Sequence, residues 1–114
     1  MTILVVDDEL DIRESLRDLF EDAGYEVATA ADGAQALAMI EEGEAPCVVI
    51  LDLVMPKVSG NEVYARMQGD DRLADVPVII ATSDPSRAPR DVPVLRKPID
   101  IRRLLAVVRQ HCGC

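Results

Sequence analysis

The sequence predicts an α/β fold, with one doubly wound domain built on a five-stranded parallel sheet. Two observations predict it. Short runs rich in β-branched residues alternate with stretches of helical periodicity, an order typical of parallel sheets covered by helices. Three of the runs are apolar throughout, as strands buried on both faces are. The 114 residues match the length of a single domain with one sizeable core.

Five segments have the composition of strands. The second alternates between polar and apolar residues, and the fifth contains Pro93, which cannot donate a hydrogen bond to a neighbouring strand. We therefore expect these two segments at the edges of the sheet. The expected strands are Ile3–Val6, Glu26–Ala30, Val48–Leu51, Val78–Ala81 and Val92–Leu95.

The first two helices are predicted from their ends. Asp11 and Glu14 resemble a capping pair for a first helix, which Gly24 ends. Asp32 is placed to cap a second helix that ends by Gly43.

The last two helices differ in length. The third is short and covers Asn61–Gln68. The fourth follows the capping candidate Asp100 and has the clearest amphipathic pattern. Its apolar positions are Ile101, Leu104, Leu105 and Val108.

Between the fourth and fifth strands lies "SDPSRAPRD", residues 83–91, where Pro85 and Pro89 disfavour a helix. Nine residues span about 30 Å if extended at roughly 3.3 Å per residue, enough to return along a strand but not to include a regular helix. We expect an extended crossover that shortens or replaces a helix. It should leave apolar surface uncovered over the fourth and fifth strands, and such a patch commonly marks an interface.

The charge is unevenly distributed. A net charge of −9 disfavours nucleic acid and anionic membranes as direct partners. Residues 87–114 nevertheless hold seven of the 12 basic groups, which suggests either an acidic protein partner or a solvated face. The apolar run Ile3–Val6 is too short for a signal peptide, so we expect a soluble cytoplasmic protein.

The three cysteines are odd in number and poorly spaced for a zinc site. Cys47 opens an apolar strand and is expected to pack in the core. Cys112 and Cys114, beside His111, could bind a metal or form a redox pair, but an inert tail is the favoured interpretation.

Polar residues follow several strands at the point where each ends. Asp7 and Asp8 follow the first strand and Asp52 the third, while Thr82 and Lys97 follow the fourth and fifth. Ligands of open parallel sheets bind beyond the carboxyl ends of the strands. Three clustered carboxylates call for a cation, and Mg²⁺ prefers such hard oxygen ligands. A carboxylate can accept a phosphoryl group, a transfer that a metal, a hydroxyl and an ammonium group would assist.

These residues resemble the motifs of response-regulator receiver domains, the CheY-like phosphoacceptors of two-component signalling, from Ile3 to about Arg109. The resemblance implies a flavodoxin-like sheet with strand order 2-1-3-4-5, and residues 1–114 as a single receiver domain without an output domain. The matching segments are "VVDDE", "VVILDLVMPKVSG", "PVIIATS" and "LRKP".

The resemblance also implies roles for the polar residues. Asp52 would be the phosphoacceptor, Thr82 would hydrogen-bond the phosphoryl group and Lys97 would pair with it, and the bond from Lys97 to Pro98 is typically cis in the family. The protein would be a signalling domain rather than an enzyme. The Mg²⁺ ligands would be Asp7, Asp8, Asp52 and the backbone carbonyl of Val54.

Partners follow from the same resemblance. A histidine kinase or a histidine phosphotransfer protein would supply the phosphoryl group, and a downstream protein target is expected on the surface of residues 83–112. A homodimer is left open.

Two features depart from the family pattern. Val94 stands where the family usually has an aromatic residue, and only fifteen positions separate Thr82 from Lys97. These departures favour, as an alternative, a receiver-like adaptor that binds its partner without phosphorylation. A Mg²⁺-dependent phosphohydrolase with an aspartyl nucleophile is less favoured, because such enzymes usually have aspartates two positions apart and a cap. A flavodoxin-type flavin site is weaker still, since carboxylates would repel a phosphate.

Overall fold

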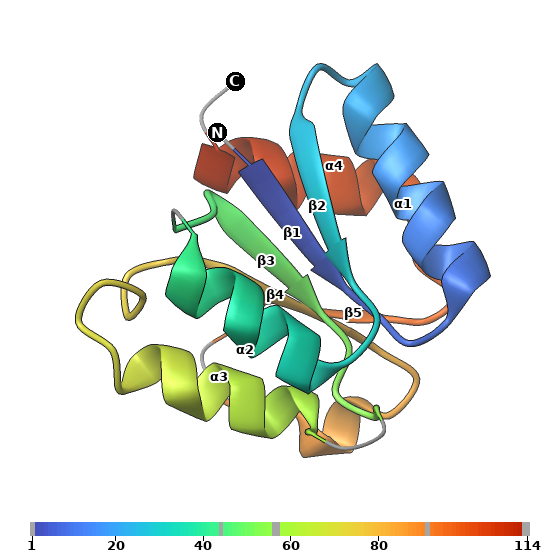
Figure 1. Cartoon of the computed structure of the whole chain (residues 1–114). Helices are drawn as coiled ribbons and strands as arrows, with labels where there is room; N and C mark the ends of the chain where they lie inside the picture. The colour runs from blue at the N-terminus through green and yellow to red at the C-terminus, as the bar shows by residue number, and fades with distance from the viewer. Residues whose placement is uncertain (1, 44, 56–57, 91, 113–114) are drawn as a thin grey trace.

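The computed structural model describes residues 2–43, 45–55, 58–90 and 92–112 (Figure 1). A five-stranded parallel sheet has the order β2-β1-β3-β4-β5, as predicted, with the second and fifth strands at its edges. The strands are β1 Thr2–Val6, β2 Glu26–Ala30, β3 Val48–Leu51, β4 Val78–Thr82 and β5 Val94–Arg96. The helices are α1 Leu10–Asp22, α2 Gly33–Glu42, α3 Gly60–Gln68, α4 Ile101–Cys112 and the 3₁₀ turn η1 Pro85–Arg87.

The sheet separates two apolar layers, because successive strand residues point to opposite faces. Leu4 and Val6 of β1 pack with α2 and α3 on one face. Ile3 and Val5 pack with α1 and α4 on the other, and Figure 1 shows these helix pairs on opposite sides of the sheet. The three central strands are almost entirely buried. Because they pair in parallel, the carboxyl ends of β1, β3 and β4 lie at one edge of the sheet.

Side-chain caps begin three of the helices. Oδ1 of Asp32 accepts the Gln35 amide at 2.8 Å for α2, and Oγ of Ser59 accepts the Glu62 amide at 3.3 Å for α3. Oδ1 of Asp100 accepts two amides at the start of α4. These contacts satisfy N–H groups that the first turn of a helix leaves free.

Helix α1 begins differently from the prediction. Asp11 and Glu14 do not cap it, since the helix starts at Leu10 after Glu9, whose side chain makes no capping hydrogen bond. Instead, Oδ1 of Asp7 accepts the Glu9 amide at 2.9 Å. The turn before α1 is therefore ordered by Asp7, which the sequence predicted as a metal ligand. The prediction that Asp11 and Glu14 cap this helix was wrong.

The crossover from β4 to β5 contains no regular helix in its described part, residues 83–90, which confirms the prediction. Its single 3₁₀ turn, η1, is held against α3 because the side-chain amide of Asn61 donates to the Arg87 carbonyl at 2.8 Å. Strand β5 is shorter than predicted and begins at Val94. Pro93 still takes part in pairing through its carbonyl, which accepts the Ile80 amide at 2.9 Å.

The predicted apolar patch over β4 is not found. Val78 and Ile80 are buried, because Ala88, Val92 and Val94 of the crossover and β5 pack against the same cluster. An extended segment thus covers the sheet with its own side chains. What remains is a groove of about 370 Å³ whose lining includes Tyr64, Gln68, Pro93 and His111.

A disulfide joins Cys47, just before β3, to Cys112 in the last turn of α4, with 5.6 Å between the two Cα atoms. Cys47 therefore forms a covalent bond in addition to the predicted packing in the core. The prediction that Cys112 belongs to an inert tail was wrong. Cys114 lies outside the described residues. In the described part of the chain, none of the helices has the length and apolar character needed to cross a membrane.

Candidate functional site

Three carboxylates meet at the carboxyl ends of β1 and β3. Val6 pairs with Leu51, so the residues that follow, Asp7 and Asp52, stand side by side. One carboxylate oxygen each from Asp7, Asp8 and Asp52 lies within 4.8 Å of the others. Asp7 and Asp52 are 3% and 5% exposed, whereas Asp8 is exposed to solvent. The structure thus brings together the three side chains that the sequence predicted as a cluster.

Lys97 reaches this cluster from the end of β5. Its Nζ lies 2.9 Å from Oδ2 of Asp7 and 3.4 Å from Oδ2 of Asp52. The backbone of Lys97 is fixed by its amide, which donates to the Thr82 carbonyl at 2.9 Å, and its peptide bond to Pro98 is cis, as expected.

A fourth carboxylate, which the sequence analysis did not assign, completes the site. Oε1 of Glu9 lies 3.4 Å from Nζ of Lys97, and its side chain is 60% exposed while that of Lys97 is 11% exposed. The available signal was the third acid of "DDE". Three carboxylates therefore lie within ion-pair distance of one ammonium group, Asp8 lies beside two of them, and these groups together carry excess negative charge.

The pKa values of Asp52 and Lys97 reflect both burial and the charges around them. Burial, aided by repulsion from Asp7, raises the pKa of Asp52 above its usual value, although Lys97 and the Val54 amide act in the opposite direction. Burial alone would lower the pKa of Lys97, but its hydrogen bond to Asp7 and the charges of Asp7, Asp52 and Glu9 raise it. The charged form of Lys97 is thus favoured, and ionisation of Asp52 is less favourable here than in water.

Thr82 and Val54 lie at the edge of the cluster without joining it. Thr82 is fully buried at the end of β4, and its Oγ1 accepts the Asp84 amide at 3.1 Å rather than bonding to a carboxylate of the cluster in the described part of the chain. The Val54 amide donates to Oδ1 of Asp52 at 3.4 Å. The predicted role of its carbonyl stays a prediction.

Gly60, at the start of α3, allows the backbone to pass closely behind Asp52. A Cβ at Gly60 would collide with the Asp52 carbonyl and would lie 2.7 Å from Cα of Leu53. The Gly60 amide donates to the Leu53 carbonyl at 3.0 Å. The segment that follows Asp52 is therefore held by backbone contacts that need the absence of a side chain.

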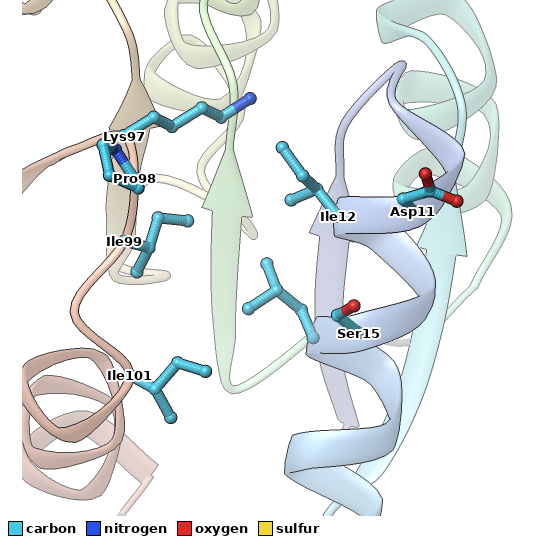
Figure 2. A pocket seen from close by; sticks show the side chains of 8 residues that line it. Asp11, Ile12, Ser15, Lys97, Pro98, Ile99 and Ile101 are labelled. Atoms are coloured by element: carbon cyan, nitrogen blue, oxygen red, sulfur yellow. The ribbon is translucent and has the colours of Figure 1, made fainter.

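An apolar hollow of about 260 Å³ lies beside the cluster, between α1 and the segment after β5. Figure 2 shows the side chain of Ile12 on one side of it and those of Ile99 and Ile101 on the other, with Lys97 and Pro98 at one end. Ile101 is 49% exposed. A surface that another protein could contact thus adjoins the acidic site.

Comparisons with known proteins agree with this geometry. Residues 3–109 match the family model described as response regulator receiver domain. The chain is 37% identical over 114 residues to response regulator MprA of Mycobacterium tuberculosis, covering 94% of this chain and 48% of that protein. It therefore spans about half the length of MprA. It is also 33% identical over 119 residues to an uncharacterised 14.6 kDa protein of Leptolyngbya boryana, covering 98% of this chain and 90% of that one.

Solved structures give the same result. Chemotaxis response regulator CheY4 of Vibrio cholerae superposes with a TM-score of 0.86 at 30% identity, covering 96% of both chains. Response regulator TrrA of Thermotoga maritima, solved in complex with Mg²⁺-BeF, superposes with a TM-score of 0.83 at 33% identity, also covering 96% of both chains. By sequence, fold and the acidic cluster at the ends of β1 and β3, this chain belongs to the response regulator receiver domain family.

Proposed function

We propose that Asp52 accepts a phosphoryl group from a phosphohistidine of a histidine kinase or phosphotransfer protein, with Mg²⁺, and that this changes the binding of a protein partner. The single observation that carries the proposal is the position of Asp52. It is buried, burial raises its pKa, and it lies 3.4 Å from the ammonium group of Lys97. A carboxylate in this setting favours a state that brings positive charge to it.

The residues fit a magnesium ion. Asp7, Asp8 and Asp52 offer hard oxygen ligands within 4.8 Å of one another, the kind that Mg²⁺ takes from one or two carboxylates while keeping several waters. We propose these three and the Val54 carbonyl as the ligand set. The similar protein TrrA was solved in complex with Mg²⁺-BeF, which supports Mg²⁺ as the metal. When bound, the metal would neutralise charge on the phosphoryl oxygens.

The chain's own residues would carry out the transfer of the phosphoryl group. An oxygen of Asp52 attacks phosphorus, so the O–P bond forms as the N–P bond to the donor histidine breaks. Lys97 pairs with the phosphoryl oxygens as a point charge. The Thr82 hydroxyl, now the acceptor for the Asp84 amide, turns to donate to the phosphoryl group. The domain thus takes up and later loses one phosphoryl group as a signal.

The apolar hollow beside Lys97 is the proposed docking surface for the phosphodonor. It adjoins the acidic cluster, since Lys97 lines both. Ile12, Pro98 and Ile101 offer apolar contacts to a histidine-bearing helix, and such a helix can lay an apolar face into a groove. Docking there would bring the histidine of the donor toward Asp52.

Output is proposed to run through the crossover. The Thr82 hydroxyl holds the Asp84 amide, Oδ1 of Asp84 accepts the Ser86 amide at 3.3 Å, and Asn61 holds the Arg87 carbonyl. When Thr82 turns to the phosphoryl group, the Asp84 contact changes and η1 is released from its present position. The response is then a shift between two populations of the crossover, without the aromatic residue that Val94 replaces.

The downstream partner is proposed to be an acidic protein surface. The exposed arginines of β5 and α4 have no carboxylate partner among the described residues, although the chain holds 21 acidic groups. Complementary charge would steer such a partner to this end of the molecule. The arginines are Arg96, Arg102, Arg103 and Arg109.

The proposed function is tested by intact-mass measurement after incubation with a small phosphodonor such as acetyl phosphate, with Mg²⁺ or with a chelator. One added phosphoryl group is expected on the wild type with Mg²⁺, none with the chelator and none on Asp52→Ala. Asp18→Ala, which removes an exposed carboxylate of α1, is the matched control and should behave as wild type. An adduct on Asp52→Ala would contradict the assignment.

A receiver-like adaptor that binds its partner without phosphorylation is the second candidate. The crossover with one 3₁₀ turn and Val94 in place of an aromatic residue favour it. No adduct under any condition would support this candidate. A phosphohydrolase is not proposed, because Asp7 and Asp8 are adjacent. We further propose that residues 1–114 act as one receiver domain in the cytoplasm, where histidine-phosphorylated donors present their phosphoryl groups.

A further inference from the structure

We infer that Glu9 is a positioning residue for the divalent cation. When the cation binds Asp7 and Asp52, the ammonium group of Lys97 moves away from them and pairs with Glu9. The inference rests on the proposed metal site, and it adds a role for a residue that belongs neither to the proposed ligands nor to the proposed phosphoryl contacts.

The first step of the argument is that Lys97 and the cation need the same two carboxylates, those of Asp7 and Asp52. Oδ2 of Asp7 and Oδ2 of Asp52 are the partners of Nζ at 2.9 and 3.4 Å, and the same two carboxylates belong to the group that could hold a metal. A divalent cation at these ligands would lie beside a full positive charge in a largely buried site, where Coulomb repulsion is weakly screened. The ammonium group must therefore move for the cation to bind well.

The second step is that Glu9 is already in place to receive it. Its Oε1 lies 3.4 Å from Nζ of Lys97, and Glu9 is outside the acidic group of Asp7, Asp8 and Asp52. It precedes α1 as the residue before the first helical position, yet its carboxylate makes no capping hydrogen bond. The side chain is thus free to hold Lys97 without giving up a structural contact.

The third step is that Glu9 can follow the movement while its backbone stays fixed. Its side chain is 60% exposed, so its rotamer can change at little cost. Its amide is held by Oδ1 of Asp7, which keeps Glu9 next to the metal ligands. Lys97 would therefore remain near the cluster, paired with Glu9, and ready to return to an incoming phosphoryl group.

The test is a double-mutant cycle on the affinity for Mg²⁺, measured by isothermal titration calorimetry without any phosphodonor. Wild type, Glu9→Gln, Lys97→Met and the double variant are compared. Glu9→Gln is expected to weaken Mg²⁺ binding about fivefold when Lys97 is present, and less than about twofold in the Lys97→Met background, a coupling of the usual size for linked sites. Glu14→Gln, with the same charge change at an exposed position of α1, is the matched control and should weaken binding less than about twofold.

Other outcomes would overturn the inference. An equal loss in both backgrounds would mean that Glu9 acts only as a nearby negative charge, and unchanged or tighter binding by Glu9→Gln would mean that it does not receive the ammonium. If Lys97→Met does not fold, the Lys97 side-chain resonances of the wild type and of Glu9→Gln are followed by NMR during the Mg²⁺ titration. The chemical shifts of these Lys97 resonances should move to new values in the wild type only. The same change of chemical shift in both proteins would overturn the inference.

The readout also separates this inference from the proposed function. A wild type that binds no Mg²⁺ removes the metal site and the inference with it. A wild type that binds Mg²⁺ with the expected coupling, but takes up no phosphoryl group, supports the role of Glu9 and contradicts phosphorylation of Asp52.

Discussion

Nζ of Lys97 lies closer to Asp7, at 2.9 Å, than to Asp52, at 3.4 Å. In the unphosphorylated protein, Lys97, which is proposed to contact the phosphoryl group, is thus held most closely by Asp7, a proposed metal ligand. The ammonium group serves as a partial substitute for the cation, because it neutralises carboxylates that would otherwise repel one another. Metal binding, Lys97 and the charge state of Asp52 should therefore depend on one another.

Lys97→Met should destabilise the protein in the absence of metal. Removing one partner of a buried ion pair typically costs about 3–5 kcal/mol, and we expect about 2–3 kcal/mol here because Glu9 is exposed and solvent screens its pair with Lys97. Mg²⁺ should recover part of the loss by replacing the missing charge. Urea unfolding with a chelator and with Mg²⁺ measures both effects.

Arg96→Met is the matched control for that experiment, since Arg96 is an exposed cation at the end of β5, next to Lys97 in the chain. It should change the free energy of unfolding by less than about 0.5 kcal/mol. Equal destabilisation by both variants, or no recovery of Lys97→Met with Mg²⁺, would contradict the proposed role of the ammonium group.

Asp52→Asn should stabilise the metal-free protein at neutral pH. The pKa of Asp52 is raised in the folded state, with burial as the main cause, repulsion from Asp7 in support and attraction by Lys97 against it. The native protein therefore binds this proton more tightly than the unfolded chain. Stability falls as the pH rises from the ordinary value of 3.8 through the raised value, and a neutral Asn avoids this loss.

The measurement is the free energy of unfolding of both proteins in chelator, at neutral pH and near pH 3. The advantage of Asp52→Asn should be present at neutral pH and should disappear in acid, where Asp52 is protonated in both states. A variant less stable than wild type at neutral pH would show that the contact with Lys97 outweighs burial.

Gly60→Ala should destabilise the protein and disturb Asp52. The added Cβ would lie 2.7 Å from Cα of Leu53 and would collide with the Asp52 carbonyl, so the backbone must shift, at a cost of about 1–3 kcal/mol. Gly69→Ala is the control, because a Cβ there would meet only ordinary contacts at 3.7 Å. Thermal unfolding compares the two, and similar melting temperatures would show that the chain after Asp52 can move aside.

The two edge strands and the acidic cluster could be predicted from sequence because both follow from local patterns, whereas the full strand order came from the resemblance to receiver domains. Apolar runs mark the central strands, and residues that follow parallel strands must meet at one edge of the sheet. The start of α1 could not be predicted from its own residues. Oδ1 of Asp7 takes the Glu9 amide, and this contact competes with the local capping pattern at Asp11 and Glu14.

Other features depend on contacts between distant segments. The sequence does not say which of three cysteines pair, and Cys47 and Cys112 are 65 positions apart. The prediction of an apolar patch assumed that an extended crossover leaves the sheet uncovered, whereas Ala88 and Val92 cover β4. Glu9 was missed because its partner, Lys97, follows a strand at the far edge of the sheet.

Reduction of the disulfide between Cys47 and Cys112 should lower stability. A bridge that closes a loop of this length restricts the unfolded chain by about 4 kcal/mol in the chain-entropy model, and it holds the end of α4 near β3. Cys112→Ser should lose about as much stability as reduction by dithiothreitol. Cys114→Ser should leave the effect of reduction intact, whereas unfolding that is insensitive to dithiothreitol would contradict the prediction.

Ile101→Asp should separate transfer from a protein donor from phosphorylation by a small molecule. Ile101 is 49% exposed at the edge of the apolar hollow, so a charge there would weaken a docked apolar helix by about 1–2 kcal/mol, or roughly tenfold. The rate of transfer from a purified phosphotransfer protein, phosphorylated on histidine, should fall by that factor. The rate with acetyl phosphate should not change, because Ile101 is not one of the residues of the acidic cluster. Ala106→Asp changes an exposed position of the same helix and should leave both rates unchanged. If Ile101→Asp lowers the rates with both donors equally, its effect lies in the phosphorylation site and not in the docking surface.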